Sequence, residues 1–203
     1  MWRSLVAHLT GGQGAAGSNP VIPTQKVQIG TWSNNRCASL ALRSRVVARP
    51  VPLIRRAIPA DAAAIANLWL RSWAAALPTV TRAHADDDVR EYTRDVLVPT
   101  HETWVMVLEP LSQEALVGFM VLGDGWIEQL YLEPDYIGRG LGVDLVDLAK
   151  EQCPDGLQLW TFAVNAPARR FYGRQGFVEV EETDGAGNEE RAPDVRLVWH
   201  PQT

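Results

Sequence analysis

The sequence predicts an α/β domain in which helices pack on a central sheet, and three observations support this class. Apolar residues alternate in some segments and recur every three or four residues in others, in the order βα, α, βββ, α, β, α, ββ. Of the 203 residues, 46% are hydrophobic and 21% are charged, as is typical of a globular protein with a real core. A glycine-rich turn, residues 138–142, joins an apolar strand to an amphipathic helix.

We expect residues 1–52 to form a poorly ordered basic extension and residues 53–203 to form the folded domain. Residues 1–56 contain eight basic residues and no acidic one, and residues 10–35 are rich in Gly, Ser, Asn, Gln and Pro. A transit peptide, a nonstructural tail and a start codon assigned too early are the alternatives for this extension.

Charge and cysteine content restrict the function classes. Residues 57–203 carry the remaining 11 basic residues and all 24 acidic ones, a net charge of −13, which disfavours nucleic acid and favours cationic solutes such as amines. No run of about 18 apolar residues predicts a membrane span. Cys37 and Cys153 have no paired ligand spacing, so we expect no metal, no disulfide framework and a cytoplasmic location.

The first half of the domain predicts one strand and two helices before the main strands begin. Residues 53–58 are predicted to form a strand, and Asp61 is placed to cap the helix that follows. One face of that helix is expected to be buried, and Pro78 ends it. A second helix is predicted over residues 85–97, stopping before Pro99. The buried face consists of Ile65, Leu68, Trp69 and Trp73.

The second half alternates strands and helices. Residues 123–125 predict a tight turn within a group of three strands. Asn165 is expected to cap the last helix and Gly176 to end it. The last two strands are predicted to pair across an acidic loop. The predicted strands are 102–109, 115–122, 126–133, 157–164, 177–183 and 195–200, and the predicted helices are 141–151 and 165–175.

The turn IGRGLG, residues 137–142, does not match two common phosphate-binding patterns. A Walker loop needs Lys and then Ser or Thr after its last glycine, where this chain has Val143 and Asp144. A dinucleotide fingerprint needs a third glycine three positions after the second, and Val143 stands there. A plain tight turn and a helix N-terminus that binds an anion by its backbone are the interpretations left open.

Further motifs in register with the turn resemble the GCN5-related N-acetyltransferase family over about residues 53–203. That family has Gln/Arg-x-x-Gly-x-Gly/Ala at this turn, and here Ile137 replaces the Gln/Arg while Gly140 and Gly142 match. The segments LYLEP and IRRAIPADAAAIANLW are also similar to the family. A second motif, Asn-x-x-Ala-x-x-Phe-Tyr followed by Gly-Phe, is matched by Asn165, Ala168, Phe171, Tyr172, Gly176 and Phe177.

The resemblance implies the acyl-CoA N-acyltransferase fold, a mixed and mostly antiparallel sheet with flanking helices whose fourth and fifth strands splay apart. It implies acetyl-CoA as co-substrate, with the pantetheine arm held by backbone near Leu130, Leu132 and Val164. Ile137 removes a polar contact, so we expect weaker but retained binding. The pyrophosphate is then expected at the N–H groups of the turn and helix start, formed by Ile137, Gly138, Arg139, Gly140, Leu141 and Gly142.

The resemblance also implies catalytic roles. Tyr172 would protonate the leaving thiolate, and a core tyrosine beside Phe171 is the alternative. Asn165 would contact coenzyme A as well as cap its helix. Glu128 is expected to be the general base, on the same strand face as Trp126, Leu130 and Leu132, and a solvated strand-end acid is the alternative.

Other residues are candidates for binding or deprotonating the acceptor amine. His84 and His101 are alternative bases, and 86–88, an Asp triplet, is expected to be a helix-start charge cluster rather than a grip for a cation. One of the two tryptophans on the first helix is a candidate for lining an acceptor pocket. The acidic loop 183–194 either selects an amine or is a solvated hairpin.

The predicted function is direct acetyl transfer from acetyl-CoA to a small amine, without an acyl-enzyme. A protein or peptide amine is the alternative acceptor, and a degenerate acyl-CoA-binding module is the alternative from another class, kept open by Ile137. We expect no nucleic-acid or membrane partner and allow for a homodimer. Nucleic-acid binding by the basic extension is a weaker alternative.

Overall fold

The computed structural model describes residues 51–109 and 115–201. The predicted extension, residues 1–52, therefore lies almost entirely outside the described residues. The strands are β1 (Val51–Arg56), β2 (Glu102–Glu109), β3 (Ala115–Gly123), β4 (Trp126–Leu132), β5 (Leu157–Phe162), β6 (Val178–Thr183) and β7 (Asp194–Trp199). The helices are η1 (Pro59–Asp61), α1 (Ala62–Ala76), α2 (Asp86–Tyr92), η2 (Thr93–Leu97), α3 (Val98–Thr100), η3 (Pro134–Tyr136), α4 (Leu141–Gln152) and α5 (Ala166–Arg174).

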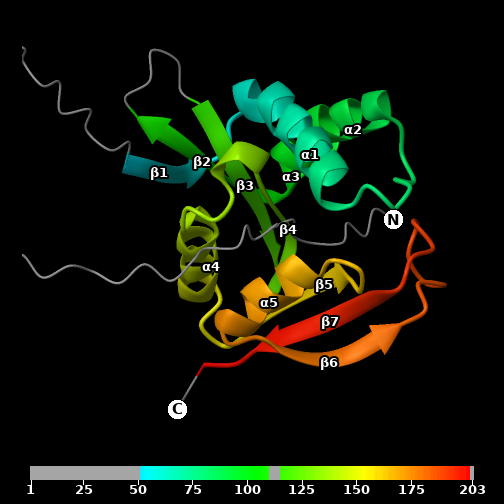
Figure 1. The fold of residues 1–203 in the computed structure, drawn as a ribbon. Coiled ribbons are helices and arrows are strands. Elements are labelled where there is room, and N and C mark those ends of the chain that lie inside the picture. The colour runs from blue at the N-terminus through cyan, green and yellow to red at the C-terminus, as the bar shows by residue number, and fades with distance from the viewer. Residues whose placement is uncertain (1–50, 110–114, 202–203) are drawn as a thin grey trace, which may run out of the picture. The chain divides into compact units, whose positions relative to one another are not determined.

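The strands form one seven-stranded sheet in the order β1-β2-β3-β4-β5-β7-β6. All neighbours are antiparallel except β4 and β5, which are parallel. These two strands share a single register pair, Trp126 with Gln158, and the N–H of Gln158 donates to the carbonyl of Gly125 at 2.9 Å. The predicted α/β class and the predicted splay between the fourth and fifth strands are both confirmed (Figure 1).

Apolar side chains cover both faces of the sheet. The core on one face joins α4 and α5 to the sheet through residues such as Leu145 and Phe171. The core on the other face joins α1 and α2 to it through residues such as Ile65 and Val89. Figure 1 shows α4 and α1 on opposite sides of β3 and β4. The predicted apolar face of the first helix is buried as expected, because it packs on this sheet.

Asp61 caps η1, the 3-10 turn that precedes α1, and not α1 itself as predicted. Its side chain makes no cap hydrogen bond to α1. It accepts instead from the N–H of Ile58 at 2.8 Å, at the start of η1, and from both terminal nitrogens of Arg55 at 2.7 and 3.0 Å. Burial opposes ionisation of Asp61, but these hydrogen bonds outweigh it, and the pKa of the carboxyl is lowered.

The prediction that the second helix stops before Pro99 is wrong. A π-helical turn, η2, follows α2 and continues into α3, which contains Pro99 in its first turn. A proline is tolerated there because the first residues of a helical turn need no N–H donor. The Thr100 hydroxyl donates to the carbonyl of Val96 at 2.7 Å and helps to close this last turn.

The ends of two predicted strands differ by two residues from those in the structure. The first strand begins at Val51 rather than at residue 53. The strand predicted over 157–164 ends at Phe162, since the N–H of Asn165 turns back to the carbonyl of Phe162 at 2.8 Å. The predicted turn at 123–125 is confirmed, with Asp124 and Gly125 at φ of 43° and 80°.

Candidate functional site

The glycine turn lies between the end of β4 and the first residue of α4. Gly138 and Gly140 have φ of 79° and 90°, which L side chains rarely adopt, so the backbone conformation itself requires glycine there. A Cβ added at either position would meet no described atom within 4 Å. Gly142 is buried in the first turn of α4. The Val143 N–H donates to the Gly140 carbonyl at 2.9 Å, so the N–H groups at the very start of α4, those of Leu141 and Gly142, are the ones that the open turn presents to an anion.

Two side chains of the turn have different surroundings: one packs against the core and the other is exposed to solvent. Ile137, at the position where the family has Gln or Arg, packs against the core under α4. Arg139 is exposed, and its guanidinium carbon lies 4.8 Å from the centre of the Tyr136 ring. A cation is thus stacked beside the helix start, where it adds to the positive end of the helix dipole.

The split between β4 and β5 opens toward this turn. Leu130 and Leu132, the predicted cofactor-binding positions on β4, are buried on the α4 face. Val164, in the turn after β5, is 58% exposed. The backbone of β4 beyond its single pairing with β5 has no neighbouring strand on that side, so its N–H and C=O groups there need partners other than a strand.

Tyr172 is fully buried on α5, and its hydroxyl has no hydrogen-bond partner among the described residues. Its ring packs edge-on against Phe171 and Phe177, with centroids 5.0 and 5.4 Å away. Burial raises the pKa of the phenol well above its usual value, and nearby Tyr131 adds to this effect. The phenol therefore keeps its proton at neutral pH and can act as a hydrogen-bond donor.

Asn165 caps α5 as predicted. Its Oδ1 accepts from the N–H of Ala168 at 3.2 Å, and the side chain is buried. Sequence reasoning missed Thr161 on β5, whose hydroxyl is also buried without a described partner. Thr161 lies two residues after Leu159 on β5, so both side chains point to the face of the sheet that α5 covers.

Glu128 is the extra residue of a β-bulge, which changes the face that it was predicted to occupy. Val121 pairs with Gln129 and Leu122 pairs with Ile127, so Glu128 has no partner on β3. A Cβ on Gly123 would lie 2.6 Å from the Glu128 carboxylate, which places this side chain over Gly123 on the α1 face. The prediction that Glu128 shares a face with Leu130 and Leu132 is wrong, because the bulge reverses the alternation.

The bulge also directs Gln129 to the α1 face, a residue that sequence reasoning passed over. Gln129 is 2% exposed, and its Oε1 has no hydrogen-bond partner among the described residues. Strict alternation would have sent Glu128 and Gln129 to opposite faces. Only the bulge brings the carboxylate and the carboxamide to the same face.

Of the rival bases, His84 is bound into the acidic loop and His101 is held at the end of α3. His84 Nε2 lies 2.9 Å from Glu189 Oε2, and His101 Nδ1 lies 2.9 Å from the Thr100 hydroxyl. The Asp triplet 86–88 forms the first turn of α2, where Asp88 accepts from the N–H of Ala85 at 3.0 Å. The triplet thus has the helix-start position that the sequence predicts.

Trp69 and Trp73 are 3% and 5% exposed and belong to the core between α1 and the sheet. Trp69 packs on Tyr131, with ring centroids 5.7 Å apart, and Trp73 packs edge-on against Phe162 at 5.6 Å. Their burial favours a structural role over the predicted pocket lining.

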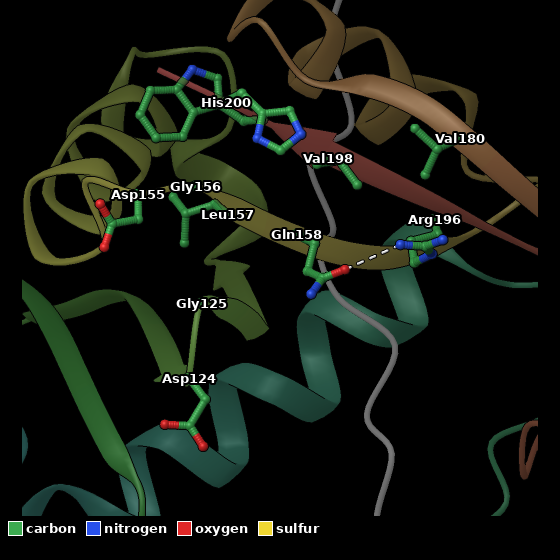
Figure 2. A pocket seen from close by; sticks show the side chains of 11 residues that line it. Asp124, Gly125, Asp155, Gly156, Leu157, Gln158, Val180, Arg196, Val198 and His200 are labelled. Carbon is green, nitrogen blue, oxygen red and sulfur yellow. Dashed lines mark hydrogen bonds between the residues drawn. The ribbon is translucent and has the colours of Figure 1, made fainter.

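A hollow of 540 Å³ lies elsewhere, on the part of the sheet formed by β5, β7 and β6 (Figure 2). Gly125, Gly156 and Gln158 border it, so it lies at the end where β4 and β5 pair. Arg196 Nη1 donates to Gln158 Oε1 there at 3.2 Å. The glycine turn stands at the other end of β4, and the hollow contains none of the predicted site residues.

The splayed sheet and the glycine turn at a helix start define an acyltransferase of the GNAT class. The acetyltransferase (GNAT) family model matches residues 63–177, and the chain belongs to this family. The resemblance seen in the sequence and the fold that it implied are confirmed. Within the described residues no helix has the length and apolarity to cross a membrane, and no cluster of metal-ligating side chains occurs.

Two similar relatives are called peptidyl-lysine N-acetyltransferase YjaB. The one from Salmonella typhimurium is 32% identical over 61% of this chain and 81% of its own length. The one from Escherichia coli K12 is 31% identical over 61% of this chain and 80% of its own. The solution structure of apo YjaB from E. coli has a TM-score of 0.62 and 26% identity, covering 73% of this chain and 97% of that one.

A more distant structure supports the fold alone. The PaiA N-acetyltransferase of Thermoplasma acidophilum, solved with coenzyme A, has a TM-score of 0.57 at 18% identity. It covers 74% of this chain and 99% of that one.

Proposed function

We propose that the protein transfers the acetyl group of acetyl-CoA directly to a primary amine of a small molecule. Two observations on one face of the sheet support this proposal: an open glycine turn at the start of α4, and a buried phenol on α5 whose hydroxyl has no hydrogen-bond partner among the described residues. The N–H groups of the turn can bind the diphosphate of coenzyme A, and the phenol can donate a proton to the thiolate that leaves at the other end of the pantetheine arm.

The anion would be held mainly by backbone. The first N–H groups of α4 point out of the helix start, and Gly138 and Gly140 leave the approach to them open. Arg139 adds a positive charge, whereas Ile137 is turned into the core and adds no polar contact. We therefore expect binding that depends more on the glycine conformation than on side-chain charge.

In the proposed reaction the amine nitrogen attacks the thioester carbonyl carbon, and the C–S bond breaks. Glu128 takes the proton that the ammonium must lose before attack, and Tyr172 gives its proton to the departing sulfur. The nitrogen loses a second proton as the amide forms, and this proton returns through solvent to Tyr172. An amine with an ordinary pKa near 10.4 is neutral in only about one molecule in two thousand at pH 7, so a nearby carboxylate increases the reactive fraction. Glu128 and Tyr172 approach the split from opposite faces of the sheet, as the donor and acceptor sides require.

A lysine side chain of a protein is the second candidate acceptor, favoured by the names of the two YjaB relatives. A non-catalytic acyl-CoA-binding module is the third, favoured by the loss of the polar residue at Ile137. The three differ in what they do with acetyl-CoA: the first two consume it in the presence of different amines, and the module binds it without turnover.

The test measures coenzyme A release by the full chain against a panel of small amines and lysine peptides, with the product identified by mass. We expect acetylated small amines and a 10- to 100-fold loss of kcat/KM in Glu128→Gln at pH 7. This loss should shrink at higher pH, where more of the amine is already neutral. The matched control is Glu151→Gln, an exposed residue near the end of α4 with the same change of charge. Bound acetyl-CoA with no turnover on any amine would contradict the proposal.

A further inference from the structure

We propose that the acceptor is a small amine with a second positive charge and that Glu189, on the loop between β6 and β7, binds this second charge. The inference rests on the proposed function and names the substrate class of that same site. It concerns a cluster that we call the acidic mouth, defined as Glu128, Glu189 and Glu190 with His84 and Tyr92.

The acidic mouth is assembled from segments far apart in the sequence. Glu128 comes from the bulge of β4, Tyr92 from the end of α2, and Glu189 from the β6–β7 loop. His84 Nε2 and Glu189 Oε2, 105 residues apart, lie 2.9 Å from each other and tie this loop to the segment before α2. Burial raises the pKa of Tyr92, and both Glu128 and Glu189 raise it further, so the two carboxylates act on one phenol.

Glu190 adds a third carboxylate to the same place. Its carboxylate accepts hydrogen bonds from backbone at Glu190 and Ala83, and its Oε2 is buried without a described hydrogen-bond partner. Burial raises the pKa of Glu190; Glu189 raises it as well, whereas the backbone hydrogen bonds and His84 lower it. Glu189 and Glu190 therefore both lie by His84, and Glu128 and Glu189 both act on Tyr92. The five residues of the acidic mouth include three carboxyl groups and one histidine, and Arg82 donates to the His84 carbonyl at its edge at 2.7 Å.

An independent observation beside Glu128 points to a ligand. Gln129 is 98% buried and projects to the same face as Glu128, yet its Oε1 accepts no hydrogen bond from the described residues. A buried carbonyl oxygen left unpaired is costly, and an N–H donor that enters with a ligand removes the cost. An ammonium has three such donors, so one can bind Gln129 Oε1 while another gives its proton to Glu128.

These contacts assign two positions to the acceptor. The reacting amine lies between Glu128 and Gln129, next to the split that holds the thioester. The second cation lies toward Glu189, whose side chain is 32% exposed and can receive a charge from solvent at modest desolvation cost. A monoamine of the same length occupies only the first position, so it binds more weakly than the diamine.

The test compares putrescine, a four-carbon diamine, with n-butylamine, which has the same carbon chain and one charge, using the full protein and saturating acetyl-CoA. We expect kcat/KM for putrescine to exceed that for butylamine about tenfold, and Glu189→Gln to reduce this preference to about threefold or less. The preference should also fall as NaCl is raised. Glu189→Asp keeps the charge and should retain part of the preference, and Glu151→Gln should retain all of it.

Other outcomes separate this inference from the proposed function. Equal use of both amines, with no effect of Glu189→Gln on their ratio, overturns the inference and leaves acetylation of small amines standing. A single-lysine peptide preferred about tenfold over putrescine overturns it in favour of a protein acceptor. Absence of turnover on every amine, with acetyl-CoA bound, overturns the proposed function itself. Glu189→Gln is scored only on the ratio of the two amines, which a general loss of folded protein does not change.

Discussion

Tyr172 illustrates how one residue can be part of the core and still have its polar atom unused. Its ring packs among aromatic neighbours, and its hydroxyl finds no described partner although it is fully buried. A purely structural tyrosine in that position would be replaced by phenylalanine at no cost, because an unpaired buried hydroxyl destabilises a protein. In the proposed reaction the hydroxyl gains its partner when the substrate binds.

Tyr172→Phe should lower kcat about 100-fold while the Kd for acetyl-CoA stays within about twofold. The variant should melt at the same temperature as the parent or higher, since a buried unpaired group is removed. Stopped-flow release of coenzyme A, calorimetry and a thermal melt check the three quantities. Unchanged turnover would remove Tyr172 from the mechanism.

At the turn, glycine is required by a positive φ angle and not by lack of space for a side chain. Gly140 has φ of 90° and open space around it. Gly140→Ala should therefore strain the turn by about 1–2 kcal/mol and weaken acetyl-CoA binding about tenfold, through distortion of the first N–H groups of α4. Gly173→Ala on α5, which has an ordinary helical φ and equal space, is the control and should bind normally. Equal binding by both variants would contradict the backbone cradle.

At the scale of elements, short polar contacts hold the helices where the site needs them. Arg71 on α1 makes two hydrogen bonds to Glu133, at 2.9 and 2.7 Å, and so joins α1 to the segment between β4 and the glycine turn. Arg55 and Asp61 join β1 to the entry of α1 in the same manner. Both pairs involve residues next to or on α1, and α1 also packs on the sheet through the ring contacts of Trp69 with Tyr131 and of Trp73 with Phe162.

Asp61→Asn should destabilise the fold by about 1–2 kcal/mol at pH 7, because the charge-assisted bonds to Arg55 and the Ile58 N–H are weakened. The folded-state pKa of Asp61 lies below its ordinary value, so its contribution is present above that ordinary value and is lost as the pH falls through the folded pKa. Urea unfolding of both proteins at pH 7 and near pH 3 should show the difference narrowing at the lower pH. A difference independent of pH would assign the effect to packing.

At the scale of the whole molecule, the sheet is interrupted at the place where it would otherwise be strongest. Two central strands, β4 and β5, meet at a single pair, and the cores on the two faces are built from different helices. A ligand that enters the split would supply the hydrogen bonds that the strands do not make to each other. Ligand binding and stability are then directly linked.

Acetyl-CoA at about 100 times its Kd should stabilise the protein by about 2.7 kcal/mol. For a domain of this size that corresponds to a rise in Tm of roughly 5–10 °C. Differential scanning fluorimetry of the parent and of Gly140→Ala at one ligand concentration checks the rise and its dependence on the turn. An unchanged Tm in the parent, with saturation verified by calorimetry, would contradict preferential binding of acetyl-CoA to the folded protein.

The order and type of elements, the α1 face, the Asn165 cap, the hairpin turn and the glycine turn were all predictable from sequence, because each is specified by residues a few positions apart. Periodicity reports which residues are buried, and glycine, asparagine and proline report where the backbone must turn. Motif spacing was enough to indicate the family and its splayed strands. The stop placed before Pro99 was wrong because a π-helical turn let the proline fall in a first helical turn.

Only the tertiary structure decided which side chains meet. Because of the bulge in β4, Glu128 and Gln129 both lie on the α1 face. No pattern in the segment WIEQLYL predicts that one of its residues is unpaired. The contact between His84 and Glu189, which builds the acidic mouth, joins a loop before α2 to one near the end of the chain. Local sequence determines backbone conformation through short-range sterics and hydrogen bonds, whereas a binding site depends on strand register and on long-range packing, which are properties of the assembled sheet.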